Sequence, residues 1–337
     1  MDAAHASQRA GCVAAELVAR GSVPGLALAF VEGGEPAGEQ VLGFADQARQ
    51  TPLSPRHVFQ AASLAKCVTA WSAARLAEQG RIDFEAPIER YLTRWRLPQS
   101  GFDHARITVR RVLSHTAGLS RPDYPGFEPE TPLPGLDVRA IESAGNGFRY
   151  SGGGYALLAQ AVEEITGEPF ADHVARHIFG PLGMNRSTFD QASTLTAEAA
   201  TGHDAAGGAL PFYRFDGAAA AGLFSTVQDL ARFAAAHLTG PGGETPGRGV
   251  LAPRGLATLT APFARTQRAD GLWSEYGLGY EVERLENGRV FLGHHGVNRG
   301  WRALLAIEPD AGRALVALAN ADAATPVLEG VFSAWSG

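Results

Sequence analysis

Lysine is almost absent from this chain of 337 residues, which carries a single one, Lys66. Every other basic side chain is an arginine. An arginine keeps its proton in a protein, whereas a buried lysine can lose it. Position 66 is therefore the one place where a side-chain amine can act as a base. We expect Lys66 to be buried, because burial disfavours the charged ammonium and lowers its pKa.

Other absences narrow the class of protein. No apolar run reaches the length of a membrane span, and the N-terminus lacks the basic start and apolar core of a signal peptide, so we expect a cytoplasmic protein that does not interact with membranes. The net charge is −6 and no basic stripe is present, which argues against nucleic-acid binding. Two distant cysteines, Cys12 and Cys67, do not suggest a disulfide scaffold.

Several common site motifs are also missing. The chain has no Gly-x-Ser-x-Gly nucleophile elbow, and the phosphate-binding Gly-x-x-x-x-Gly-Lys is absent. His173 and His177 stand four residues apart, but the glutamate of His-Glu-x-x-His is lacking. We interpret this pair as part of a solvated helix face, and the sequence implies neither a metal nor an organic cofactor.

Hydrophobic periodicity predicts helices and strands in two groups. We expect an antiparallel sheet that combines N-terminal and C-terminal strands, with terminal helices against it and a helical insertion between. The fold class is therefore α+β. The predicted helices are 3–20, 63–79, 107–113, 154–167, 170–178, 226–238 and 323–335, and the predicted strands are 23–30, 39–44, 276–282, 288–293, 301–307 and 314–319.

Ser63 lies three residues before the lone lysine, at the predicted start of a long helix. Residues i and i+3 share one face of a helix, so the amine of Lys66 can reach the serine hydroxyl. A serine hydroxyl needs such a base to become a nucleophile. The positive potential of a helix N-terminus favours both an alkoxide and a neutral amine.

Two further segments carry side chains that suit the same chemistry. Tyr150 precedes a predicted helix, where its phenol can shuttle a proton. His294 and His295 follow a predicted strand, with Gly296 and Val297 after them. The backbone N–H groups of Val297 and Ser63 are candidates for an oxyanion hole, which acyl transfer requires.

Taken in order, Ser63-x-x-Lys66, Tyr150-Ser-Gly and His294-His-Gly296 resemble the three signatures of the penicillin-binding and class C β-lactamase-like serine hydrolases, which include family VIII esterases. The stretches Val112-Leu-Ser-His-Thr-Ala-Gly-Leu119, Pro181-Leu-Gly-Met184 and Ala221-Gly-Leu-Phe-Ser-Thr-Val-Gln-Asp-Leu230 are similar to this family as well. The resemblance runs from about residue 20 to residue 320.

The resemblance implies a single catalytic domain over residues 1–337 with the DD-peptidase/β-lactamase-like fold. An α/β lobe would span about 1–62 and 216–337, and a helical lobe about 63–215, with the site between them. Ser63 would be the acylated nucleophile, and Lys66 and Tyr150 would share the base and acid roles. His294 would contribute electrostatics near the leaving group or a substrate carboxylate.

Two departures from the family pattern bear on the substrate. Gly152 stands where relatives often have an asparagine that contacts the acylamide of a lactam or peptide. His294 replaces a lysine, and an imidazole binds a carboxylate less firmly than an ammonium. Both favour a hydrolase of small esters or amides. A D-amino-acid peptidase, DD-carboxypeptidase or weak β-lactamase, an acyltransferase, and a non-catalytic binding or sensor protein remain alternatives.

The rim of the site is the least determined part. His295, Gly296 and Gly152 are substrate-binding candidates through the resemblance. The aromatic residues of the 120–148 loop and of the segment 211–215 either line an apolar acyl pocket or pack the lobes together; the candidates are Tyr124, Phe127, Phe212 and Tyr213. The expected partner is a small ester, amide or peptide-like molecule.

Overall fold

The computed structural model describes residues 3–120, 138–214, 217–266 and 273–337. Its helices are α1 (Ala3–Ala19), α2 (Ala65–Glu78), α3 (Val109–Leu113), α4 (Gly152–Thr166), α5 (Phe170–Val174), α6 (Ala218–Ala221), α7 (Val227–Ala235), α8 (Pro253–Thr260) and α9 (Thr325–Ser336). None of the helices within these ranges combines the length and the apolar character needed to cross a membrane.

Nine of the described strands form one sheet, in the order β3-β2-β1-β11-β10-β9-β8-β7-β6. These strands are β1 (Gly25–Glu32), β2 (Glu35–Asp46), β3 (Thr51–Pro52), β6 (Ala264–Arg265), β7 (Glu275–Tyr276), β8 (Glu281–Arg284), β9 (Val290–Asn298), β10 (Trp301–Glu308) and β11 (Arg313–Ala319). All neighbours in this sheet pair antiparallel. The first strands therefore join the last ones through the pairing of β1 with β11, which confirms the expected α+β class.

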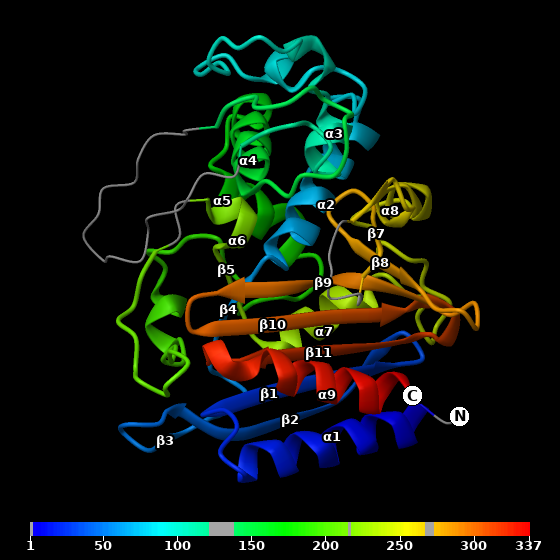
Figure 1. The fold of residues 1–337 in the computed structure, drawn as a ribbon. Helices are drawn as coiled ribbons and strands as arrows, with labels where there is room; N and C mark the ends of the chain where they lie inside the picture. The colour runs from blue at the N-terminus through cyan, green and yellow to red at the C-terminus, as the bar shows by residue number, and fades with distance from the viewer. Residues whose placement is uncertain (1–2, 121–137, 215–216, 267–272) are drawn as a thin grey trace.

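Helices cover both faces of this sheet, because side chains on both of its faces are apolar. Leu28 and Leu304 belong to the apolar cluster beneath α1 and α9, whereas Ala29 and Leu305 belong to the larger cluster on the opposite face. The helix α7 packs on that opposite face, against β1, β2 and β11. Figure 1 shows α1 and α9 side by side across one face of the sheet, and the group α2 to α5 beyond the β9 side.

The sequence did not predict every element. A two-stranded ribbon of β4 (Phe59–Ala62) and β5 (Leu223–Ser225) packs on the main sheet without pairing with it, and α6 and α8 are additional short helices. Strand β9 is longer than expected, since it continues through residues 294–297 to Asn298. The predicted helix 170–178 divides into α5 and a π-helical turn, Ala175–Phe179.

Candidate active site

Ser63 occupies a bend between β4 and α2. The pairing of β4 with β5 shifts register after Gln60, and Ala62 has a φ of 49°, a left-handed conformation that is uncommon for a residue with a side chain. Helix α2 begins two residues after Ser63, not at Ser63 as the sequence suggested. Strained backbone of this kind concentrates at functional sites. Here it turns the half-buried serine out of the strand at the entrance to the helix.

Lys66 lies in the first turn of α2, and its side chain is only 1% exposed, which confirms the expected burial. Its Nζ donates to Ser63 Oγ at 3.2 Å and to the carbonyl oxygen of Ala220 at 2.7 Å. The same nitrogen lies 4.7 Å from the centre of the Tyr150 ring. The amine is therefore fixed beside the Ser63 hydroxyl.

The short helix α6 contacts both α2 and β9 through its backbone carbonyl groups. Three successive carbonyl groups of α6 accept hydrogen bonds from Thr69, Lys66 and Asn298, at 2.8, 2.7 and 3.0 Å. Thr69 lies one turn after Lys66 on α2, and Asn298 is the last residue of β9. Helix α6 thus connects α2, which carries Lys66, to the strand at the other side of the site.

Tyr150 supplies the second polar contact to the nucleophile. Its Oη donates to Ser63 Oγ at 2.8 Å. His115 packs against the Tyr150 ring, with centroids 4.3 Å apart, and its Nδ1 accepts from the backbone N–H of Ser151 at 3.1 Å. Ser151 in turn caps α4, because its Oγ accepts from Gly154 N. The contacts of His115 with the Tyr150 ring and with Ser151 N thus hold the segment that bears Tyr150.

On the β9 side, His294 is 1% exposed and both of its ring nitrogens are occupied. Nδ1 lies 2.6 Å from the carbonyl oxygen of His295, and Nε2 lies 3.1 Å from the hydroxyl of Tyr276. Burial lowers the pKa of His294 to about 4, although Glu281 nearby acts in the opposite direction. His294 is therefore a neutral imidazole at pH 7, which donates from Nδ1 and accepts at Nε2.

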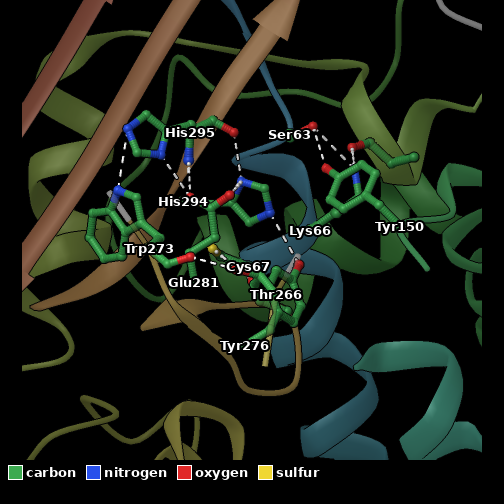
Figure 2. Close-up of polar contacts among 12 residues, drawn as sticks. Ser63, Lys66, Cys67, Tyr150, Thr266, Trp273, Tyr276, Glu281, His294 and His295 are labelled. Carbon is green, nitrogen blue, oxygen red and sulfur yellow. Dashed lines mark hydrogen bonds and ion pairs between the residues drawn. The ribbon is translucent and has the colours of Figure 1, made fainter. Parts of the chain in front are cut away.

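His295 points away from Ser63. Residues alternate between the two faces of a strand, and His295 pairs with Leu304, whose side chain belongs to the α1–α9 face. Its Nδ1 contacts the buried carboxylate of Glu281 at 2.8 Å, and its Nε2 accepts from Trp273 Nε1 at 3.3 Å. Figure 2 shows His295 and Trp273 on the side of His294 that is remote from the nucleophile. The structure thus does not bring this substrate-binding candidate to the site.

Gly296 and Val297 lie beside the strand that leads into Ser63. A Cβ atom at Gly296 would come within 2.6 Å of the carbonyl oxygen of Ala61 and 3.1 Å of Ala62 Cβ. Only glycine allows this close approach of β9 to β4. Val297 follows with its side chain 60% exposed. The backbone N–H groups of Ser63 and Val297 remain our prediction for the oxyanion hole.

The other candidates fall in different places. Gly152 is the buried first residue of α4, directly after the segment of Tyr150. Phe212 and Tyr213 line a pocket of about 240 Å³ together with Gln60, and the lining residues of that pocket do not include the nucleophile. The hydroxyl of Tyr213 donates to the Arg299 carbonyl at 2.8 Å, which is a packing role. Tyr124 and Phe127 lie outside the described residues.

Sequence reasoning missed two residues of the β9 side. Tyr276 is the hydrogen-bond partner of His294, and Glu281 holds both the backbone N–H and the ring of His295. Both side chains are buried. They come from β7 and β8, and their contacts depend on the pairing of β8 with β9. Nothing in the sequence around Glu281 indicates that its carboxylate is buried in the folded protein.

The chain is similar to known proteins over most of its length. The model of the family described as Beta-lactamase matches residues 13–330. Penicillin-binding protein 4* of Bacillus subtilis (strain 168) is 31% identical over 170 residues, which cover 46% of this chain and 36% of that protein. The chain therefore matches well under half of the length of this curated relative.

Solved structures share the fold over nearly the whole chain. The D-amino acid amidase from Ochrobactrum anthropi SV3, complexed with L-phenylalanine amide, superposes with a TM-score of 0.79 at 23% identity, covering 98% of this chain and 99% of the amidase. A class C β-lactamase from Rhodobacter sphaeroides superposes with a TM-score of 0.77 at 20% identity, covering 98% of both chains. At these identities the likeness establishes the fold.

Proposed function

The chain belongs to the Beta-lactamase family, and from this premise we propose that it is a serine hydrolase that acts on small esters or amides through an acyl-enzyme at Ser63. One observation carries the proposal. Lys66 Nζ and Tyr150 Oη both lie within hydrogen-bond distance of the half-buried Ser63 Oγ. A nucleophile with its base inside such a distance is the arrangement that covalent catalysis requires.

In the proposed reaction, Ser63 Oγ attacks the substrate carbonyl while its proton passes to the Lys66–Tyr150 pair. The oxyanion that forms is bound by the backbone N–H groups of Ser63 and Val297. The tetrahedral intermediate then expels the alcohol or amine, which takes the proton back from the pair. A water molecule, deprotonated by the same pair, attacks the acyl-enzyme, and the acid product leaves as Ser63 regains its proton.

The neutral state of His294 bears on the substrate class. A lysine at this position in a relative would offer a fixed positive charge, whereas His294 has a lowered pKa of about 4 and spends both nitrogens on protein partners. It therefore offers no charge to a substrate carboxylate at pH 7. This supports a substrate that is neutral at this end, as an ester or a primary amide is.

The test is covalent labelling with a fluorophosphonate probe, followed by mass spectrometry of the peptide that contains Ser63. We expect one adduct per chain, on Ser63, and none in Ser63→Ala. Ser72→Ala is the control, because Ser72 is a buried serine of the helix α2 that follows Ser63, and it should label like the parent. A folded parent protein that takes no label, or equal labelling of Ser63→Ala, would contradict the proposal.

A substrate panel separates the related activities. We expect p-nitrophenyl esters of short acids to be hydrolysed faster than a chromogenic cephalosporin. D-aminoacyl amides test the activity that the Ochrobactrum anthropi amidase is named for. Added alcohols or amines reveal an acyltransferase if the transfer product exceeds the hydrolysis product. A stable adduct without turnover on any substrate would indicate a binding or sensor protein instead.

A further inference from the structure

Glu168, His173 and His177 form a cluster in the helical part of the chain, apart from the Ser63 site. Glu168 lies in the turn between α4 and α5, His173 is in α5, and His177 is in the π-helical turn Ala175–Phe179. One ligand atom from each residue falls in a group whose members lie within 4.8 Å of one another. This is a juxtaposition of two imidazoles and one carboxylate.

The distances within the cluster approach those around a tetrahedral metal ion. Glu168 Oε2 lies 3.5 Å from His173 Nδ1 and 3.6 Å from His177 Nε2. Metal–ligand distances of about 2.0–2.2 Å in tetrahedral geometry place neighbouring ligand atoms roughly 3.3–3.6 Å apart. Two edges of the tetrahedron are thus already close to the required length, with Glu168 Oε2 as their common corner.

The burial of His173 gives a second, independent observation. We had interpreted this histidine pair as a solvated helix face, but His173 is only 3% exposed, so that interpretation is wrong for His173. His173 Nδ1 is in ion-pair range of Glu168 Oε2, but neither of these atoms, nor His173 Nε2, makes a hydrogen bond within the described ranges. A buried polar group without a partner costs free energy and calls for an explanation, such as an ion that the structure does not contain.

The surroundings orient the cluster. Arg176 Nη1 lies 2.6 Å from Glu168 Oε1, so one carboxylate oxygen is held by the guanidinium and the other faces the two histidines. Contacts of this kind from a neighbouring residue fix the direction of a ligating carboxylate. The rings of His173, in α5, and His177, in the π-helical turn, lie 4.6 Å apart between centroids, and π-helical turns frequently occur at functional sites.

We propose that Glu168, His173 and His177 bind a divalent transition-metal ion, best matched by Zn²⁺. Two imidazoles and one carboxylate are ligands that zinc accepts, and the fourth position would be filled by water. The ion would connect the turn after α4 to the π-helical turn, and it would coordinate Nδ1, one of the two buried ring nitrogens of His173. Ser63, Lys66 and Tyr150 are not part of this metal site, so the metal proposal does not depend on the hydrolase proposal.

The experiment uses full-length protein stripped with a chelator, in a Cys12→Ser background that removes the exposed free thiol. Zn²⁺ is titrated by competition with a fluorescent chelator, and Co²⁺ is followed by its visible absorption, which is strong in four-coordinate sites. We expect one Zn²⁺ per chain, intense cobalt bands that zinc abolishes, and a higher melting temperature with zinc bound.

Two variants test the ligands. His177→Ala and Glu168→Gln alter partly exposed side chains, and each should weaken zinc binding by at least about tenfold, since even residues that only support metal ligands have effects of that size. His104→Ala is the matched control, because His104 Nδ1 lies 3.5 Å from Glu89 Oε2 but, among the described residues, no second histidine joins that pair. It should bind zinc like its parent. No zinc binding by the parent, or unchanged affinity in both ligand variants, would overturn the proposal.

Discussion

The two sides of the candidate active site use hydrogen bonds differently. On the nucleophile side, Lys66 and Tyr150 converge on one atom, Ser63 Oγ, which stays partly accessible. On the β9 side, His294 is fully occupied by Tyr276 and by the carbonyl group of its own neighbour. The first arrangement concentrates proton-transfer groups where a substrate can arrive. The second satisfies its polar groups internally, and so serves to shape the site.

The largest expected effect follows from replacing the base by a cation that keeps its proton. Lys66→Arg should lower kcat/KM for an ester by about 10³-fold or more, because arginine cannot accept the serine proton. The measurement is steady-state hydrolysis of the best p-nitrophenyl ester, with circular dichroism to verify folding. Because arginine is larger, Lys66→Met serves as a second variant and should be equally inactive.

Thr69→Val is the control for the contact with α6. This substitution removes the hydrogen bond from Thr69 to the Ala219 carbonyl group and leaves the contacts of Ser63 unchanged. The neighbouring carbonyl group, that of Ala220, accepts from Lys66. Activity should stay within a few-fold of the parent. If Lys66→Met keeps parental activity, another group takes the proton of Ser63. Proton transfer could then no longer be assigned to Lys66.

Removal of the Tyr150 hydroxyl should have the second largest effect on activity. Tyr150→Phe should lower kcat/KM by about 10²-fold, the lower end of the range for a positioned proton-transfer group. The ring keeps its packing on His115, so a structural effect should be small. Tyr155→Phe is the matched control, since its hydroxyl donates to the Leu113 carbonyl and not to Ser63. Loss of activity in Tyr155→Phe equal to that in Tyr150→Phe would indicate that both act through packing.

Much of the fold follows from hydrophobic periodicity, because long amphipathic helices and half-buried strands carry it. Helix α1 was predicted to within one residue, and the last two strands are nearly as expected. The ribbon of β4 and β5 was not predicted, because four-residue and three-residue strands contain too little pattern. Its pairing of Phe59 with Ser225 also spans a large part of the chain, which local sequence cannot reveal.

The candidate site, like the fold, has parts that the sequence predicts and parts that it does not. The Ser63–Lys66 contact depends on helical spacing, which a sequence displays directly. The side of β9 on which His295 lies was not predicted, because the expected strand ended at residue 293 and the alternation of side chains was not extended to His295. The roles of Tyr276 and Glu281 were not readable, because their contacts depend on the register between separate strands. The left-handed backbone at Ala62 could not be predicted either, because alanine has no preference for that conformation.

Acidification should destabilise the protein through its buried neutral histidines. The pKa values of His294 and His237 are both lowered to about 4 by burial. Unfolded histidine titrates near 6.5, so between about pH 6.5 and pH 4 the unfolded chain takes up protons that the folded chain refuses. The free energy of unfolding should therefore fall over this range, by up to about 3 kcal/mol for each histidine, and the histidine contribution is fully favourable above it.

Urea unfolding as a function of pH measures this slope. His294→Gln and His237→Gln should each make it shallower, because each removes one such group. His237 is a close match to His294, since its nitrogens also contact a backbone carbonyl and a tyrosine hydroxyl, those of Phe233 and Tyr280. Activity should separate them, with a decrease confined to His294→Gln. An unfolding free energy that does not decrease toward pH 4 would contradict the neutral assignment.

The smallest expected effect concerns the hydroxyl that supports His294. Tyr276→Phe removes the donor to His294 Nε2 and leaves that nitrogen buried without its partner. This should lower the free energy of unfolding by about 1 to 2 kcal/mol, measured by urea denaturation at neutral pH. Ester hydrolysis should decrease less than about tenfold, well below the effect of Tyr150→Phe. If Tyr276→Phe instead abolishes hydrolysis while the protein stays folded, the β9 side takes part in proton transfer, because His294 lies 6.2 Å between ring centroids from Tyr150, whose hydroxyl contacts Ser63.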